Sequence, residues 1–385
     1  MCGAVGCMVW CIVVFLAYMD SGNRLSKAID LIRFPMIVGI VVIHANFTGM
    51  EIFMPYAQSA TFATRLIYFF SEVVARCCVP LFFAISGYLF FKNVDRFTAG
   101  VYGRKIKGRC KSVLQPYLIW NLIGFLFLLC KKLPPFTAYF PGVADMPLGI
   151  GSFVDCFWNF HYSEVGAPMV GEAFLPGYPI DFPLWFLRDL ILIQLLTPLI
   201  YAVVKLRYLN MVYMTVLGLM FVSGLAIGPV RLDGLFFFSI GAAVAILRID
   251  FVSGIVRQWW LPWVYIAVGI CDLLTCDETW NHYIHAAQIL LGIGAAMYVA
   301  LRCAGGAVRV SRFLIGGAFF VYVSHGLIDR IVIKLLYGIM DPVTSAMWSL
   351  CYIGTVAVLV SVPLGVYWLL NRYAPSVSRL LLGGR

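Results

Sequence analysis

An arginine and a histidine, Arg33 and His44, stand eleven positions apart in a stretch that is otherwise almost entirely apolar. Eleven helical steps of about 100° come within roughly 20° of three full turns, so a helix places both side chains on one face, about 16 Å apart along its axis. A neutral imidazole can remove a proton from a hydroxyl group, and a guanidinium can bind a phosphate or polarise a carbonyl oxygen. The pair could therefore supply a base and an anion-binding group on one helix face, about 16 Å apart.

A structural interpretation of the same pair stays open at this point. Ionisable groups at bilayer depth are costly, so they normally face a bundle interior or water, and they favour a functional site. Arg33 could instead extend to the lipid headgroups while His44 hydrogen-bonds a neighbouring helix. The remaining chain has to decide between the two.

The composition is that of a membrane protein. Of the 385 residues, 62% are hydrophobic and 12% are charged, and the mean hydropathy is +0.92, far outside the range of water-soluble domains. The net charge of +10 comes from basic residues between apolar segments, where they act as orientation signals rather than as a nucleic-acid surface. Most of the twelve cysteines lie in apolar stretches without metal-ligand spacing, so we expect neither a metal site nor a nucleic-acid partner.

The apolar segments predict an all-α fold, a polytopic helical bundle with about ten transmembrane helices. The expected spans are about 28–50, 62–91, 112–130, 183–204, 208–227, 232–247, 258–274, 284–304, 313–337 and 344–371. The uncharged run 2–19 is long enough to add an N-terminal helix. We therefore expect a possible extra hydrophobic segment at 1–20 and a transmembrane domain at 21–385, with a long loop at about 131–183.

Lysine and arginine residues are distributed unequally between alternate loops. If residues 21–27 and the C-terminus are cytoplasmic, 19 basic residues lie in cytoplasmic segments and five lie on the opposite side. The positive-inside rule supports this orientation. We expect a multi-pass protein of the inner (plasma) membrane, embedded in the lipid bilayer, whose long loop faces outward.

Further ionisable side chains lie inside the expected spans. They are Glu72, Arg76, Arg188, Asp189, His325, Asp329 and Arg330. Together with Arg33 and His44, these ionisable residues come from at least four expected helices and could line one cavity. A bundle held together only by polar contacts would more often use Ser, Thr or Asn. The pattern favours a shared hydrated cavity.

Five short motifs occur in order along the chain. They are Arg33-x10-His44, Val-Pro-Leu-Phe-Phe-Ala-Ile-Ser-Gly-Tyr at 79–88, Gln-Pro-Tyr-Leu-Ile-Trp at 115–120, Pro-Leu-Trp-Phe-Leu-Arg at 183–188 and Ala-Phe-Phe-Val-Tyr-Val-Ser-His at 318–325. In this order the motifs resemble the acyltransferase 3 family of membrane O-acyltransferases, over about 21–372. The basic segment departs from the family, because its Arg-x-x-Arg motif is only approximated.

The resemblance implies transfer of an acyl group, usually acetyl and sometimes succinyl, from a cytoplasmic acyl-CoA to a hydroxyl of a cell-envelope or exported saccharide, such as a lipid-linked glycan. Acyl-CoA, most simply acetyl-CoA, would be a co-substrate, and no tightly bound cofactor is expected. We assign His44 as the base or transient acyl carrier, with Arg33 as a second catalytic residue. The expected donor-binding residues are Arg104, Lys107, Arg109 and Lys111, and the expected cavity or acceptor residues are Arg76, Ser86, Tyr88, Trp185, Arg188 and His325.

Structural alternatives remain for these assignments. The basic segment could serve only as an orientation signal, Ser86 could belong to a helix-packing contact, Trp185 could be an interfacial anchor, and His325 could make a structural hydrogen bond. The competing functions are a polyprenyl-glycan or solute transporter, which predicts paired repeats with broken helices, and a non-catalytic glycan-binding protein.

Overall fold

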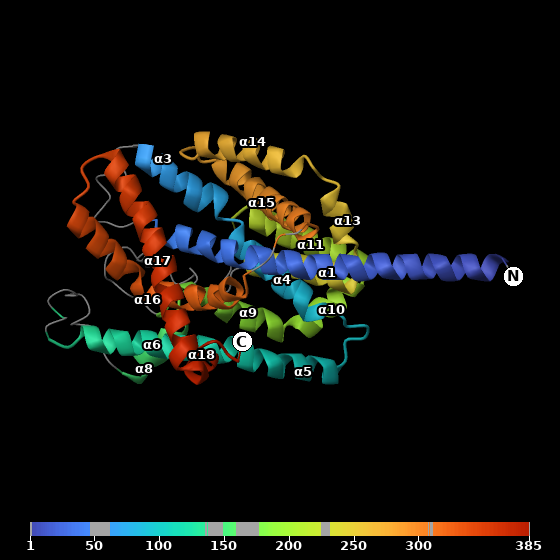
Figure 1. The fold of residues 1–385 in the computed structure, drawn as a ribbon, viewed down its shortest axis with the longest axis horizontal. Coiled ribbons are helices and arrows are strands. Elements are labelled where there is room, and N and C mark those ends of the chain that lie inside the picture. The colour runs from blue at the N-terminus through green and yellow to red at the C-terminus, as the bar shows by residue number, and fades with distance from the viewer. Residues whose placement is uncertain are drawn as a thin grey trace.

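The computed structural model describes residues 2–46, 62–134, 137, 149–158, 177–224, 232–306, 308 and 311–384, with side chains from residue 23 onward. These residues form helices and no strand, which confirms the all-α prediction. The C-terminal part of the first helix, α1 (Cys2–His44), runs through the middle of the bundle, and its neighbours include α4 (Cys78–Phe91), α15 (Asn281–Ala304) and α16 (Arg312–Met340) (Figure 1).

The helix α1 is continuous over 43 residues, whereas we expected a polar break between a run at 2–19 and a span at 28–50. Arg24 Nε donates to Leu301 O at 2.9 Å, and Lys27 Nζ donates to Gly306 O at 2.9 Å. The last carbonyls of a helix have no partner within that helix, and basic side chains bind them favourably. The polar residues that suggested a loop therefore bind the end of α15 from within a helix.

The basic segment also forms a helix where we expected a loop. The helix α5 (Ala99–Arg109) begins at Thr98, whose side chain accepts a hydrogen bond from Val101 N, and continues through a π-helical turn, η3 (Cys110–Leu114), into α6 (Gln115–Lys131). Lysine and arginine are good helix formers, but the segment lacks the apolar periodicity that reveals a helix in sequence. The basic side chains from Arg104 to Lys111 thus lie along one continuous helical segment.

The helix α4 follows α3 (Phe62–Tyr68) and a π-helical segment, η2 (Phe69–Val74), and it packs closely on α12 (Leu232–Ile246). A Cβ atom added at Gly87 would overlap Phe238 O, and one added at Gly241 would overlap Ala84 O. Small residues let helices approach closely within a membrane. These two glycines therefore set the distance between α4 and α12.

The expected span at 183–204 is broken. A 3-10 turn, η5 (Phe182–Leu184), leads into α9 (Trp185–Leu195), and α10 (Thr197–Lys205) follows after a bend of 61°. Pro198 explains the break, because proline donates no backbone hydrogen bond and its ring clashes with the carbonyl four residues earlier.

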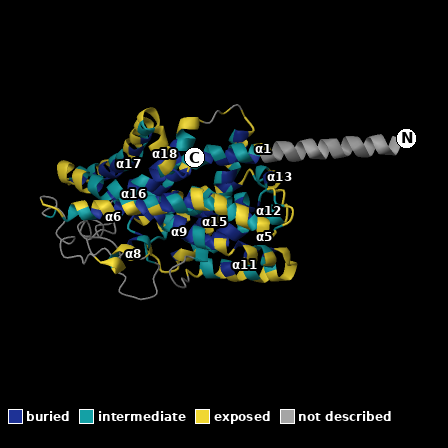
Figure 2. Ribbon diagram, turned by 90° about the horizontal axis from the view of Figure 1, so that it is seen from below, coloured by how far each residue is buried: buried dark blue, intermediate teal, exposed yellow. Residues whose placement is uncertain are grey.

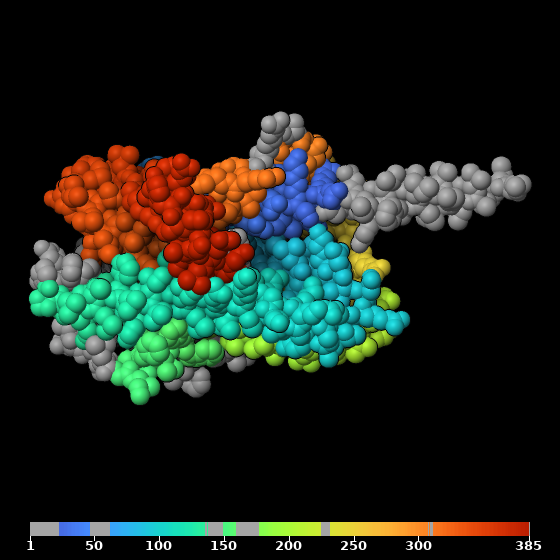
Figure 3. Space-filling view, turned by 60° about the horizontal axis from the view of Figure 1, so that its bottom comes forward, coloured from blue at the N-terminus to red at the C-terminus, as the bar shows by residue number. Residues whose placement is uncertain are grey.

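The remaining helices complete the bundle. They are α8 (Ile150–Trp158), α11 (Arg207–Val222), α13 (Phe251–Val256), α14 (Leu261–Leu274), α17 (Ser345–Tyr373) and α18 (Pro375–Leu381). Gln115 Nε2 donates to Leu380 O at 2.9 Å and Trp120 Nε1 donates to Leu381 O at 3.1 Å, so α6 holds the C-terminal helix, drawn in red in Figure 3.

Among the described residues, four helical segments are long and apolar enough to cross a membrane, and a fifth is added if the bent pair counts as one span. The four are Phe62–Phe91, Ala99–Lys131, Asn281–Ala304 and Ser345–Tyr373. Large apolar side chains such as Trp263, Leu219 and Ile353 are exposed, as expected where lipid replaces water. The helix α11 at the edge of the bundle is largely exposed, as the yellow in Figure 2 shows. The count of ten spans stays a prediction.

Candidate active site

His44 is the last residue of α1 and its side chain is half-buried. Neighbouring elements hold this helix end: Tyr352 of α17 donates to Val42 O at 3.0 Å, and Asn46 Nδ2 donates to Ser71 Oγ of η2 at 3.1 Å. The final carbonyls of a helix need external donors, and Tyr352 is one of them, whereas Asn46 ties the residue after the helix to η2. The imidazole of His44 therefore projects from a fixed position.

His325 of α16 is fully buried and lies directly against His44. Its Nε2 atom is 2.7 Å from His44 Nδ1, and the two ring planes differ by 12°. On its other side, His325 Nδ1 is 3.0 Å from Val321 O. Two histidines that are 281 positions apart in the sequence thus form one hydrogen-bonded pair.

The hydrogen-bond partners define the tautomers of this pair. A carbonyl oxygen only accepts, so His325 Nδ1 must carry a proton and, in a neutral ring, its Nε2 accepts. His44 Nδ1 is then the donor to His325, and the lone pair of His44 is on Nε2. This arrangement leaves His44 Nε2 able to accept a proton, and the hydrogen bond to His325 fixes the orientation of the His44 ring, a geometry also found between the second and third groups of a catalytic triad.

An aromatic cover lies next to the histidine pair. The ring centroid of Phe182 is 4.7 Å from that of His44, and Tyr178 lies 5.1 Å from Phe182. Two other helices hold the segment 178–183 that carries these rings. Asp181 N donates to Asn121 Oδ1 of α6 at 3.3 Å, and the Tyr322 hydroxyl of α16 donates to Pro183 O at 2.7 Å. Sequence reasoning missed Phe182, although the residue directly precedes the Pro-Leu-Trp motif.

Asp181 is fully buried beside this cover, and neither of its carboxyl oxygens has a hydrogen-bond partner among the described residues. A Cβ atom at Gly326, next to His325, would lie 2.7 Å from Asp181 Oδ1. Burial raises the pKa of the Asp181 carboxyl, and the charge of Asp329 acts in the same direction. The structure thus favours a neutral acid close to the histidine pair.

Arg33 lies three turns before His44 on the continuous helix α1, so the predicted common helix face is retained. Its Nη2 atom is 3.5 Å from Asp30 Oδ1, and 38% of its side chain is exposed. Because the axial separation is about 16 Å, Arg33 does not contact His44. A substrate that touches both residues must be long.

Three other expected cavity residues lie on different elements: Arg76 in the turn before α4, Ser86 on α4 and Trp185 on α9. Arg76 pairs with Glu72, with Nε 2.6 Å from Oε2, and 43% of its side chain is exposed. Trp185 is half-buried with its ring 6.3 Å from that of Phe83, and Ser86 is half-buried on α4. The ion pair of Arg76 and the ring contact of Trp185 are thus made with residues outside the histidine pair.

Arg188 is buried, with 3% of its side chain exposed, and it binds the protein itself. Its guanidinium pairs with Asp189 at 2.9 Å and donates to Trp158 O at 2.7 Å and Gly177 O at 2.6 Å. It also lies 5.3 Å from the centre of the Trp158 ring. Arg188 thus joins the two described ends of the long loop, Trp158 and Gly177, and its part in acceptor binding stays a prediction.

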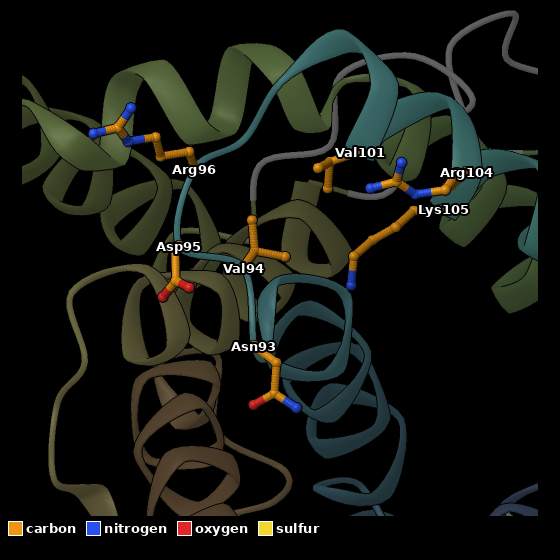
Figure 4. Close-up of a pocket in the computed structure, with 7 residues that line it drawn as sticks. All are labelled: Asn93, Val94, Asp95, Arg96, Val101, Arg104 and Lys105. Carbon is orange, nitrogen blue, oxygen red and sulfur yellow. The ribbon is translucent and has the colours of Figure 1, made fainter.

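The expected donor-binding residues lie along α5 and η3 and differ in how far they are exposed. Arg104 is exposed and lines a polar cleft together with Lys105 (Figure 4). Arg109 is half-buried over the ring of Phe90, 6.0 Å from its centre. Lys107 and Lys111 are exposed.

Comparison with known proteins identifies the family. The acyltransferase domain family matches residues 26–366, a range that contains Arg33, His44 and His325. The chain belongs to this acyltransferase family. Its apolar helices and its family membership indicate a membrane protein.

One relative adds to this assignment. The acyltransferase is 30% identical over 191 residues to the succinoglycan biosynthesis protein ExoH of Rhizobium meliloti (strain 1021), a match that covers 49% of this chain and 45% of the relative. The chain thus spans about half the length of the curated relative that it matches. No solved structure matches it significantly.

Proposed function

We propose that this acyltransferase moves an acyl group, most simply acetyl, from a cytoplasmic acyl-CoA to a hydroxyl group of a cell-envelope or exported saccharide, at the inner membrane of a bacterium. The observation that carries the proposal is the hydrogen bond between His44 and His325, which leaves one imidazole lone pair available on a half-buried ring. The family and a relative named for succinoglycan biosynthesis support the reaction class and the saccharide acceptor.

The reaction needs one base and balances without a cofactor. His44 Nε2 takes the hydroxyl proton as the acceptor oxygen attacks the thioester carbonyl carbon. The carbon–sulfur bond then breaks, and the proton passes to the departing thiolate, which leaves as the CoA thiol. His325 accepts the Nδ1–H bond from His44 throughout and stabilises the transient imidazolium.

The same lone pair also permits a two-step reaction, in which His44 is acylated first and then passes the acyl group to the acceptor. A burst of CoA release in the absence of acceptor would indicate this sequence, and a lack of any burst would indicate direct transfer. Arg33, about 16 Å from His44 towards the basic end of the bundle, is suited to bind a phosphate of the donor.

The test is transfer of labelled acetyl from acetyl-CoA to total envelope glycan, with membranes that contain either the wild type or His44→Ala. We expect labelled glycan with the wild type and none with the variant. A transporter or a non-catalytic glycan-binding protein would label the glycan in neither sample.

A further inference from the structure

Phe182 presents an exposed aromatic ring directly beside the proposed base. Its ring centroid is 4.7 Å from that of His44, and 37% of the residue is exposed, although the residues on both sides of it are buried. The hydrogen bonds from the flanking backbone to Asn121 and Tyr322 fix the chain before and after the ring. The ring of Phe182 is therefore held in place with part of its surface uncovered.

His44 is itself only half-buried. Because the two rings are adjacent and both are partly exposed, a molecule bound at His44 is placed to meet the exposed part of Phe182 as well. Phe182 belongs to the segment that leaves the long loop, on the side from which we expect the acceptor. The ring is thus suited to contact the acceptor.

Two further aromatic residues continue from Phe182. The ring of Tyr178 is 5.1 Å from that of Phe182 and is half-buried. Arg188 Nη1 donates to the carbonyl oxygen of Gly177, next to Tyr178, at 2.6 Å, and to that of Trp158 at 2.7 Å. Because one nitrogen binds both carbonyl oxygens, the backbones at Trp158 and Tyr178 are close together.

Trp158 is 41% exposed, and its ring also has a fixed neighbour. The guanidinium carbon of the buried Arg188 lies 5.3 Å from the centre of the Trp158 ring, within the range of a cation–π contact. Phe182, Tyr178 and Trp158, which we call the aromatic track, therefore extend from His44 across the two described ends of the long loop.

A row of fixed aromatic rings suits a ligand with repeated apolar faces. A sugar ring has a face of C–H groups that packs on the negative face of an aromatic ring, and a rim of hydroxyl groups that stays in water. Rigid aromatic side chains supply this contact area at a low cost in conformational entropy. The spacing of 5.1 Å between Phe182 and Tyr178 is close to the length of one sugar unit.

The charge beside the aromatic track favours the same ligand. The guanidinium of Arg188 is paired with Asp189 at 2.9 Å and binds two backbone carbonyl oxygens. These partners compensate its positive charge. The aromatic track therefore suits the uncharged faces of sugars better than a phosphate group.

We propose that the aromatic track binds successive sugar units of the acceptor, so that the acceptor is a saccharide chain rather than a single sugar. Phe182 binds the unit whose hydroxyl group reaches His44, and Tyr178 and Trp158 bind the units that follow. This assignment rests on the function proposed above. Membrane lipid is the other partner that exposed tryptophan residues meet, and the controls below separate the two.

Two substitutions remove the rings at the two ends of the aromatic track. Phe182→Ala removes the ring beside His44, and Trp158→Ala removes the most distant ring. Phe127→Ala and Trp263→Ala are the matched controls, because these residues are 42% and 67% exposed and lie outside the aromatic track. Phe182→Leu, which keeps most of the volume without an aromatic face, replaces Phe182→Ala if that variant does not fold.

The acceptors for the test are oligosaccharides of one to four units. They are prepared by partial acid hydrolysis of envelope glycan whose esters have been removed with alkali. Initial rates at saturating acetyl-CoA give the KM of each acceptor for the full chain in lipid nanodiscs. Calorimetry without the donor gives the Kd of each oligosaccharide.

The proposal predicts an effect that depends on acceptor length. The wild-type KM should fall as the acceptor grows from one unit to three. Phe182→Ala should raise the KM of every acceptor about tenfold, whereas Trp158→Ala should raise only that of the three- and four-unit acceptors about tenfold. Trp158→Phe should recover part of the loss, and the KM of acetyl-CoA should stay at the wild-type value in all variants. The two controls should match the wild type.

The outcomes separate the aromatic track from the reaction. The proposal is overturned if the wild type binds none of the oligosaccharides, if its KM does not depend on their length, or if Trp158→Ala weakens all of them equally. It is also overturned if Trp263→Ala has the same effect as Trp158→Ala, which would indicate membrane anchoring. If the wild type binds the tetrasaccharide through the aromatic track but transfers no acyl group, the proposed function fails while the track stands.

Discussion

Replacement of His325 by alanine tests how the histidine pair works. The change removes the acceptor of the His44 Nδ1–H hydrogen bond and leaves His44 itself in place. Because His325 is fully buried, we expect no direct contact with substrate, and its effect on turnover must pass through His44. The variant should let the His44 ring rotate and leave its protonated form without an acceptor.

The expected magnitude follows from this single hydrogen bond. A hydrogen bond to a charged group contributes about 1.5–3 kcal/mol, and about 1.36 kcal/mol corresponds to a factor of ten in rate. We therefore expect kcat of His325→Ala to fall about 10- to 150-fold, with the KM of both substrates near the wild-type values. His325→Gln should recover part of the loss, because its amide oxygen can accept from His44 Nδ1.

The assay is the initial rate of CoA release by purified protein, read with a thiol reagent at saturating donor and acceptor. Gel filtration and CoA binding report whether each variant is folded. A wild-type kcat in His325→Ala, or a raised KM at unchanged kcat, would refute the orienting role. If glutamine restores no more activity than alanine, the assignment of His44 Nδ1 as the donor is wrong.

Three further predictions concern stability, measured by thermal unfolding in detergent. Burial raises the pKa of Asp181 in the folded state, so the wild type loses stability as pH rises above the ordinary aspartate pKa; Asp181→Asn should be more stable at pH 7, with a gap that closes near pH 4. Arg188→Met should lose about 3–5 kcal/mol, because it breaks a buried ion pair. Gly87→Ala should lose about 1–3 kcal/mol through overlap with Phe238 O, whereas Gly338→Ala, with open space around its Cβ position, should be neutral or slightly stabilising.

Local sequence patterns predicted many of the helices and the common helix face of Arg33 and His44. The eleven-residue spacing places Arg33 and His44 on one helix face, and the structure retains that face because α1 is unbroken between them. The sequence could not predict that His325 contacts His44, since that hydrogen bond depends on the packing of α1 against α16. In the sequence His44 and His325 are two separate ionisable residues, and in the fold they form one hydrogen-bonded pair.

The errors in the predicted elements have physical causes. Arg24 and Lys27 look like a loop in sequence, yet they bind the carboxyl end of α15 across 277 and 279 positions. The helix α5 has no buried residues, so no apolar stripe marks it. The bonds from Arg188 to Trp158 O and Gly177 O depend on the tertiary fold, and no local pattern predicts them.

Turnover of purified His44→Ala tests the central claim most directly. Labelled acetyl-CoA and a saccharide acceptor are supplied at saturating concentrations, and CoA binding confirms that the variant is folded. We predict that the variant binds CoA as the wild type does and transfers no acetyl group. Wild-type turnover in the folded variant would remove His44 from the chemistry and contradict the account.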